Sequence, residues 1–536
     1  MRSPRLRSFG AALTLVAIAA FAVRLTYMLW DKGGECRIVL PDTGEVITSP
    51  TECIGSDAGR PNDAVYYNAA ANHLARGGGF TDPFHPDQPA ADHPPLTIIV
   101  LAPVSWLGDH VIPEAILSDL TNAFLHRLTM VILGTVVVAG IGLVARRVAG
   151  ERTGMFAACI AAIYPGLWIS DALVFAETLT NLAVVVAIGC ALSAREQLSP
   201  ARMARLGVAV GVCALGRAEL LLFAPLLAFV VVPLRRPRIA SQITSWRAPR
   251  DLIRPLAVLA AGVVAVLGPW IAYNNARFEE RTLISTNDGL ALAASNCEPV
   301  YYGSGIGLTS YDAAPVSASP EERADSRYCV ERPQPPGDQS EVSRAYRSRA
   351  LRVIRGRLEW QPVVIAARVG RVWNVFRPFD MVWYNEGEDR SPWATRAAIF
   401  AFFPVAGAAI TGGRQLRRIG RTPALLVLLV PMVTVTIAAG LTYGQSRYRA
   451  AAEPSLVVLA AVAVAHLGNV PRPRGLGTDP SGPSDPTNPG KATGGPARSH
   501  EAARPVVVAA IAPAPTRNGS SAGPAGTMPD PAPDAR

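Results

Sequence analysis

Apolar runs of about twenty residues recur along roughly the first 470 of the 536 positions, and this pattern limits the fold more than any other feature of the chain. Half of the residues are hydrophobic, and the mean hydropathy is +0.24. Such a run is long enough to cross a bilayer as a helix, and in hydrocarbon the backbone polar groups must pair within their own segment. The sequence therefore predicts an all-α polytopic membrane protein.

We expect about ten transmembrane helices. They lie at about 9–30, 120–144, 154–170, 173–193, 204–216, 218–233, 254–274, 393–411, 422–440 and 451–467. Basic residues before an apolar run are also typical of a cleaved signal peptide. We expect a retained anchor instead, because Arg24 lies inside the first run and no clear small-x-small cleavage site follows it.

The net charge is +10, and the arginine clusters stand beside the expected spans. Cytoplasmic loops of membrane proteins are rich in Lys and Arg, which explains these clusters without nucleic acid as a partner. With the N-terminus inside, the clusters at 146–147, 195–205, 235–238 and 414–421 all fall in the cytoplasm. Two large loops, about 31–119 and 275–392, then face the outside of a multi-pass cell-membrane protein.

Four cysteines lie in the expected outer loops. Cys36 and Cys53 lie in the first outer loop, and Cys297 and Cys329 lie in the second, where either two local disulfides or four free thiols are expected.

The last segment of the chain differs in composition from the rest. Pro, Gly and Ser dominate residues 469–536, which we expect to be a disordered cytoplasmic tail that follows a membrane domain at 1–468.

Asp63 opens an amphipathic helix in the first outer loop, and Gly77 to Gly79 are expected to end it. The carboxylate of Asp63 is either a helix cap or a group that does chemistry. Tyr67 lies on the packing face of the same helix. His93 stands before a short apolar run, either as a surface histidine or as a ligand contact.

Glu177 lies about one turn inside an expected span, where a carboxylate is costly and is a functional candidate. The alternative is a structural ion pair with Arg127 or Arg217. Asp171 either caps the same span or belongs to the site, and Arg217 either joins the site or pairs only with Glu219.

Arg447 and Arg449 are expected on the outer side, against the general charge bias. In an extended loop, residues two apart point the same way, so both guanidiniums would face one ligand. Two arginines suit a phosphate, whose oxygens accept bidentate hydrogen bonds, and contact with lipid headgroups is the alternative.

Several motifs follow one another in a recognisable order. They are Asp63-x3-Tyr67-x3-Ala71-x2-Leu74-x2-Gly77-x-Gly79-Phe80, His93-Pro-Pro-Leu96, Tyr164-Pro165 with Glu177, and Arg447-Tyr448-Arg449 with Glu453-Pro454. On these motifs the membrane region resembles the GT-C class of membrane glycosyltransferases. It is most similar to the dolichyl-phosphate-mannose protein mannosyltransferase and lipid A aminoarabinose transferase group. Many relatives have an acidic pair where this chain has Asp63 followed by Ala64. Asp63 would then act without an adjacent carboxylate, although Asp57 could approach it.

The resemblance implies inverting transfer of a sugar from a polyprenyl-phosphate donor to a protein, lipid or polysaccharide acceptor at the outer face of the membrane. Asp63 and Glu177 would be catalytic, and the substrate-binding residues would be Tyr67, His93, Asp171, Arg217, Arg447 and Arg449. No cofactor is certain, and a divalent cation stays possible because relatives differ in metal use. A structural metal is not expected, because the spacing of the possible ligands His85, Asp87, Asp92 and His93 matches no tight metal motif.

Two other interpretations remain at this stage. A transporter or flippase for a lipid-linked glycan would explain charges inside the spans, such as Arg24, Arg127 and Glu177. A non-catalytic assembly subunit would use the C-terminal tail as a tether. Lipid contact is common to all three.

Overall fold

Helices of the expected kind occupy the apolar runs. The computed structural model describes residues 4–31, 37–39, 46–48, 63–111, 122–232, 235–237, 244–246, 249–314, 317–319, 321–322, 327–331, 334–386 and 388–467. The predicted tail, the Cys36–Cys53 pair and Asp57 lie outside these residues.

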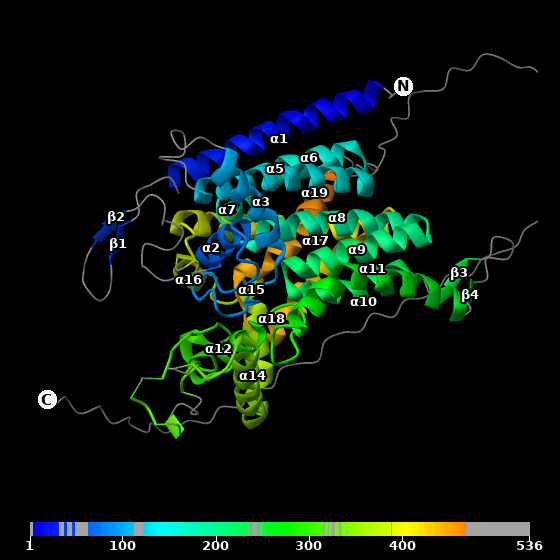
Figure 1. Ribbon diagram of the computed structural model, residues 1–536. Helices are drawn as coiled ribbons and strands as arrows, with labels where there is room; N and C mark the ends of the chain where they lie inside the picture. Colours follow the sequence, from blue (N-terminus) through cyan, green and yellow to red (C-terminus); the bar gives the residue numbers. More distant parts are fainter. Residues whose placement is uncertain are drawn as a thin grey trace, which may run out of the picture. The chain divides into compact units, whose positions relative to one another are not determined.

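The α-helices are α1 Pro4–Asp31, α2 Asp63–Ala75, α3 Leu96–Val111, α5 Asn122–Ala149, α6 Glu151–Ile163, α7 Pro165–Asp171, α8 Ala176–Glu196, α9 Pro200–Gly216, α10 Phe223–Val231, α11 Pro249–Asn275, α12 Asp288–Ala294, α14 Gln339–Gly356, α15 Gln361–Val372, α16 Asp380–Glu386, α17 Pro392–Arg418, α18 Thr422–Leu441 and α19 Glu453–His466 (Figure 1). The 3-10 helices are η1 Ala218–Leu222, η2 Glu298–Val300, η3 Gly303–Gly305, η4 Leu358–Trp360 and η5 Ser446–Ala452. Two short antiparallel hairpins pair β1 Arg37–Val39 with β2 Val46–Thr48, and β3 Arg235–Pro237 with β4 Thr244–Trp246.

In the described part of the chain, seven helices are long and apolar enough to cross a bilayer, or eight if α6 and α7 form one bent span. The seven are α1, α5, α8, α11, α17, α18 and the segment Ser446–His466. The chain is thus an α-helical, multi-pass membrane protein. Two further expected spans coincide with α9 and with η1 and α10, which are shorter, so the count of about ten stays a prediction.

The expected span at 154–170 is broken in the structure. α6 and α7 meet at an angle of 55°. Tyr164 between them has an extended backbone, and Pro165 occupies the first position of α7. Proline disfavours helical backbone in the residue before it, which explains why the helix stops here and restarts in a new direction.

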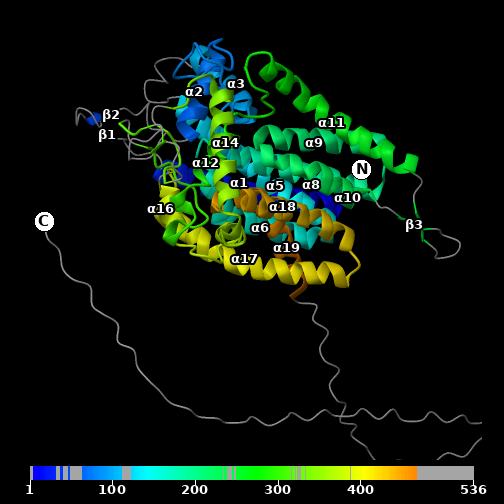
Figure 2. The same cartoon turned by 90° about the horizontal axis from the view of Figure 1, so that it is seen from below.

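Small residues bring the long helices close together. α9 lies beside α11 and α17 lies beside α19 (Figures 1 and 2). At Gly207 a Cβ atom would collide with the backbone oxygen of Leu259, and at Gly412 it would collide with the backbone oxygen of Leu459. Close approach through small residues is the usual way for membrane helices to gain packing energy.

The segment expected to be the second outer loop forms a small helical layer of its own. α12 packs against α14, and a disulfide joins Cys297 to Cys329 with their Cα atoms 5.0 Å apart. This bond confirms the prediction for the second cysteine pair. Cys159, Cys190 and Cys213, which lie in the helices, are free.

A buried ion pair fixes α1 to the remaining helices. Nε of Arg24 donates to Oδ2 of Asp171 at 2.7 Å, and both side chains are almost completely buried. The other guanidinium nitrogens of Arg24 donate to backbone oxygens, including that of Ala162 at 3.3 Å. A buried charge needs such a set of partners, so this pair ties the first span to α6 and α7.

We predict that Arg24→Leu destabilises the protein by about 3–5 kcal/mol, because it leaves the carboxylate of Asp171 buried without its partner. The Arg24→Leu/Asp171→Leu double variant should recover much of this loss. Thermal unfolding of the purified protein in detergent measures both effects, with Arg254→Leu on the exposed surface of α11 as the control. A double variant no more stable than Arg24→Leu alone would contradict this account.

Candidate active site

Asp63 is placed by the packing of α2. This helix lies against α3, and its Tyr67 and Ala71 are buried as the pattern predicts. Gly77 and Gly79, just after the helix, have φ of 87° and 70°, which glycine adopts at little cost. The glycines therefore end the helix as expected, and Asp63 in its first turn faces the bundle.

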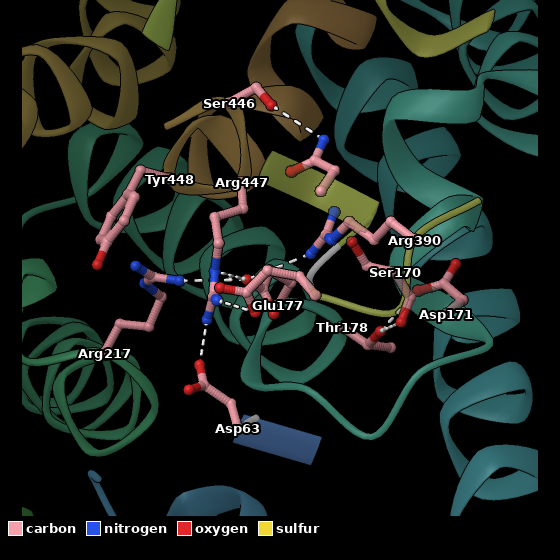
Figure 3. Close-up of polar contacts among 12 residues, drawn as sticks. Asp63, Ser170, Asp171, Glu177, Thr178, Arg217, Arg390, Ser446, Arg447 and Tyr448 are labelled. Carbon is pink, nitrogen blue, oxygen red and sulfur yellow. Dashed lines mark hydrogen bonds and ion pairs between the residues drawn. The ribbon is translucent and has the colours of Figure 1, made fainter. Parts of the chain in front are cut away.

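Glu177, in the first turn of α8, is the centre of the site. Its side chain is completely buried, and three guanidiniums converge on Oε1 (Figure 3). Nε of Arg447 lies 3.0 Å away, and Nη1 of Arg217 and Nη2 of Arg390 each lie 3.5 Å away. Oε2 has no hydrogen-bond partner within the described residues. Glu177 is thus a buried counter-ion that gathers three cations.

Arg447 connects this centre to two further carboxylates. Its Nη2 donates to Asp63, and its Nη1 donates to Oε2 of Glu388 at 2.6 Å. Its guanidinium also lies 5.2 Å from the ring centroid of Phe175. One side chain therefore holds Asp63, Glu177 and Glu388 together.

Arg217 approaches Glu177 from the side opposite to Arg390 (Figure 3). Its Nε donates to Glu219 at 2.6 Å, and its guanidinium stacks 4.2 Å from the ring centroid of Tyr448. The alternative in which Arg217 pairs only with Glu219 is therefore wrong, since Arg217 also contacts Glu177.

His93 contacts the carboxylate oxygen of Asp63 that does not face Arg447. Nε2 of His93 lies 3.5 Å from Oδ1 of Asp63 and 3.6 Å from Oδ2 of Asp92. Its ring contacts those of Tyr66 and Tyr67, with centroid distances of 5.0 and 5.1 Å. Burial lowers the pKa of His93, but the two carboxylates outweigh burial and raise it to about 9. Burial raises the pKa of Asp63, but Arg447 and His93 bring it well below its usual range.

The expected extended loop around Arg447 and Arg449 is wrong, and Arg449 contacts Glu453 rather than Glu177, although it lines the same small cavity as Arg447. Residues 446–452 form a 3-10 helix rather than an extended loop, so residues two apart diverge. Nε of Arg449 donates to Glu453 at 2.6 Å, and its Nη1 donates to the backbone oxygen of Val372.

Asp171 is also placed elsewhere. It does not cap α8, whose N-cap is Phe175, and its carboxylate pairs with Arg24 and accepts from Thr178 Oγ1 at 2.8 Å. Arg127 pairs with Asp389 and not with Glu177. The interpretation of Asp171 as a cap is therefore wrong, and no contact joins Asp171 to Asp63.

Two members of the cluster, Glu388 and Arg390, were not predicted. Both lie in a charged run directly before α17, at the expected outer end of a span. This position at the end of a span was the signal in the sequence that could have identified them.

Arg390 is 5% exposed, and its Nε has no hydrogen-bond partner among the described residues. Arg390 and Arg447, with Asn385 and Ser446, line a cavity of about 30 Å³, which has room for a couple of water-sized groups.

The donor atoms of the site do not fit a divalent cation as they stand. Arg447 holds Asp63 and Glu388, and three guanidiniums surround Glu177. Among the described residues, no group of three or more His, Cys, Asp or Glu is arranged to hold a metal. No chemical step below involves a metal, and a divalent cofactor stays an open prediction.

Comparison with known proteins adds little. No family model and no curated protein matches the chain. Solved structures of an Archaeoglobus fulgidus oligosaccharyltransferase resemble it. The complex with Zn and sulfate has 15% identity, covers 85% of this chain and 49% of that chain, and has a TM-score of 0.44. The complex with an inhibitory peptide and a dolichol-phosphate has 15% identity, covers 87% and 51%, and has a TM-score of 0.43. The form tethered to an acceptor peptide has 14% identity, covers 85% and 49%, and has a TM-score of 0.45.

The chain spans about half the length of these enzymes. At TM-scores below 0.5 this likeness carries no argument about the function of this chain, which has to be inferred from its own residues.

The raised pKa of His93 predicts a pH-dependent stability. Protonated His93 contributes fully below its unfolded pKa of about 6.5, and the contribution is lost as the pH rises through about 9. We expect the stability difference between wild type and His93→Gln to shrink by about 1–3 kcal/mol across this interval. Chemical unfolding at several pH values measures it. His85→Gln, at a mostly exposed histidine, is the control. A difference that does not vary with pH would contradict the prediction.

Proposed function

We propose that this chain is an inverting glycosyltransferase that transfers a sugar from a polyprenyl-phosphate donor to an acceptor hydroxyl at the outer face of the membrane. The observation that carries the proposal is the contact of one guanidinium, Arg447, with Asp63 and with the Glu177 cluster. A base and an anion-binding group thereby stand next to each other, as single displacement at a sugar phosphate requires.

The donor phosphate would bind to the guanidiniums of Arg447 and Arg390. Guanidinium groups form strong, charge-assisted hydrogen bonds with phosphate oxygens, and the effect grows where water is excluded. Arg390 is nearly buried, and its Nε–H has no hydrogen-bond partner among the described residues, so it can donate to a phosphate oxygen without losing a described contact. Arg217, which also contacts Glu177, would add positive charge.

Asp63 would act as the general base. The acceptor oxygen attacks the anomeric carbon, the bond from that carbon to the phosphate oxygen breaks, and its electron pair leaves with the phosphate. The proton of the acceptor hydroxyl passes to Asp63. A single displacement of this kind inverts the anomeric configuration.

The contact between Arg447 and Asp63 gives the reaction an order. With Arg447 in place, the pKa of Asp63 is well below its usual range, which makes the carboxylate a poor base. A phosphate that draws Arg447 toward itself would weaken this contact and raise the basicity of Asp63. Donor binding would thus prepare the base, while Glu177 keeps Arg447 near the site.

The positive-inside bias supports an outer location of the site. Asp63 and the start of α8 lie at the end of the bundle away from the arginine clusters at 146–147 and 195–205. Protein, lipid and polysaccharide acceptors all supply a suitable hydroxyl, so the proposal extends to the reaction class and not to one acceptor.

Asp63→Asn is expected to lower sugar transfer by about 10²–10⁴-fold, because it removes the proton acceptor. Transfer from radiolabelled polyprenyl-phosphate sugars in membranes measures the effect. Asp87→Asn, at an exposed carboxylate of the same loop, should keep wild-type activity. Near-normal transfer by Asp63→Asn would exclude this role. Movement of a lipid-linked glycan across vesicles, without any transfer by wild type, would favour a flippase.

Glu177→Gln is expected to raise KM for the donor by about tenfold or more, because the three arginines lose the charge that gathers them. Its kcat should fall less than that of Asp63→Asn, since Glu177 is buried and acts through the arginines. Steady-state kinetics separates the two parameters. Glu219→Gln, at a carboxylate that contacts only Arg217 in this cluster, is the matched control. An unchanged KM would show that Glu177 does not position the arginines.

A further inference from the structure

A second polar cavity lies far from Asp63, at the other end of α8. Its volume is about 220 Å³, and Arg147, Arg202 and Arg205 line its polar side. α8 has Glu177 in its first turn, and the residues of α8 that line the cavity run from Val186 to Ser193, so about 14–24 Å of helix separates the cavity from Glu177. By the arginine bias this end faces the cytoplasm.

The three arginines of this cavity are only partly neutralised. Arg147 forms two hydrogen bonds with Glu196, at 2.9 and 2.6 Å. Arg202 donates to the backbone oxygen of Ser193 at 2.7 Å, and Arg205 donates to a backbone oxygen of its own helix. Neither Arg202 nor Arg205 forms an ion pair with a carboxylate in the described part of the chain. The cavity therefore has surplus positive charge.

The other side of the cavity is apolar and open. Val186 of α8 is 50% exposed, and a Cβ atom added to Gly189 would meet nothing within 4 Å. A Cβ on Gly140 of α5 would touch Val185, so this face of α5 lies against α8. Val136 and Leu143 flank Gly140 on the same face and are 46% and 51% exposed. An exposed apolar seam between α5 and α8 thus leads away from the arginines.

We propose that this cavity binds the phosphate headgroup of an anionic phospholipid of the cytoplasmic leaflet, whose acyl chains lie along the α5–α8 seam. Phosphate oxygens accept charge-assisted hydrogen bonds from guanidiniums, and the seam supplies the apolar contact that a free phosphate lacks. The site lies outside the donor-binding region and does not depend on the proposed glycosyl transfer.

Binding of phosphatidylglycerol, compared with phosphatidylcholine, tests the proposal on the purified full-length protein by native mass spectrometry. Each arginine near a membrane surface contributes roughly a fivefold gain in affinity, so Arg202→Gln/Arg205→Gln should weaken phosphatidylglycerol binding by about 25-fold. The matched control is Arg414→Gln/Arg417→Gln, which removes the same charge from the exposed end of α17 and should have little effect.

Alkylation of Cys190, which lines the cavity, reports on the same site. Phosphatidylglycerol should slow its modification by a maleimide and leave that of exposed Cys159 unchanged, as followed by peptide mass spectrometry. Equal binding of the two lipids, or equal losses in the two double variants, would overturn the proposal. Protection of Cys190 by inorganic phosphate alone, equal to that by the lipid, would overturn the assignment to a lipid.

Discussion

The buried carboxylate of Glu177 is the interaction on which the site depends. A carboxylate without water or cations is unstable in a membrane protein, and three guanidiniums held together without an anion would repel one another. Glu177 resolves both problems, because Oε1 contacts Arg217, Arg390 and Arg447. These arginines come from the end of α9, the segment before α17 and η5, so one charge joins three distant parts of the chain.

Arg447 extends this network of ion pairs from the buried Glu177 to the exposed part of the site. It links the buried Glu177 to Asp63 and Glu388, which are both partly exposed. A ligand that competes for Arg447 therefore alters the environment of Asp63, and His93 keeps Asp63 in place from the other side. In the proposed mechanism, binding of an anion and activation of a base would be coupled through this single side chain.

Local patterns in the sequence predicted the helices and several members of the site, and contacts between distant segments explain what was missed. Runs of apolar residues located the long helices, and Glu177 stood out because a carboxylate inside a span is costly. The pairing of Arg24 with Asp171, 147 residues apart, has no local signal. The extended loop expected around Arg449 is a 3-10 helix, so Arg449 pairs with Glu453 and not with Glu177. Arg390 was missed because its position next to Glu177 depends on how α17 packs.

A structure of the protein with a short-chain polyprenyl phosphate bound would test the central claim most directly. The account predicts phosphate oxygens within hydrogen-bond distance of Arg447 and Arg390, an Arg447 that has left Asp63, and an intact contact between Arg447 and Glu177. A phosphate bound elsewhere, with Arg447 still on Asp63, would contradict it.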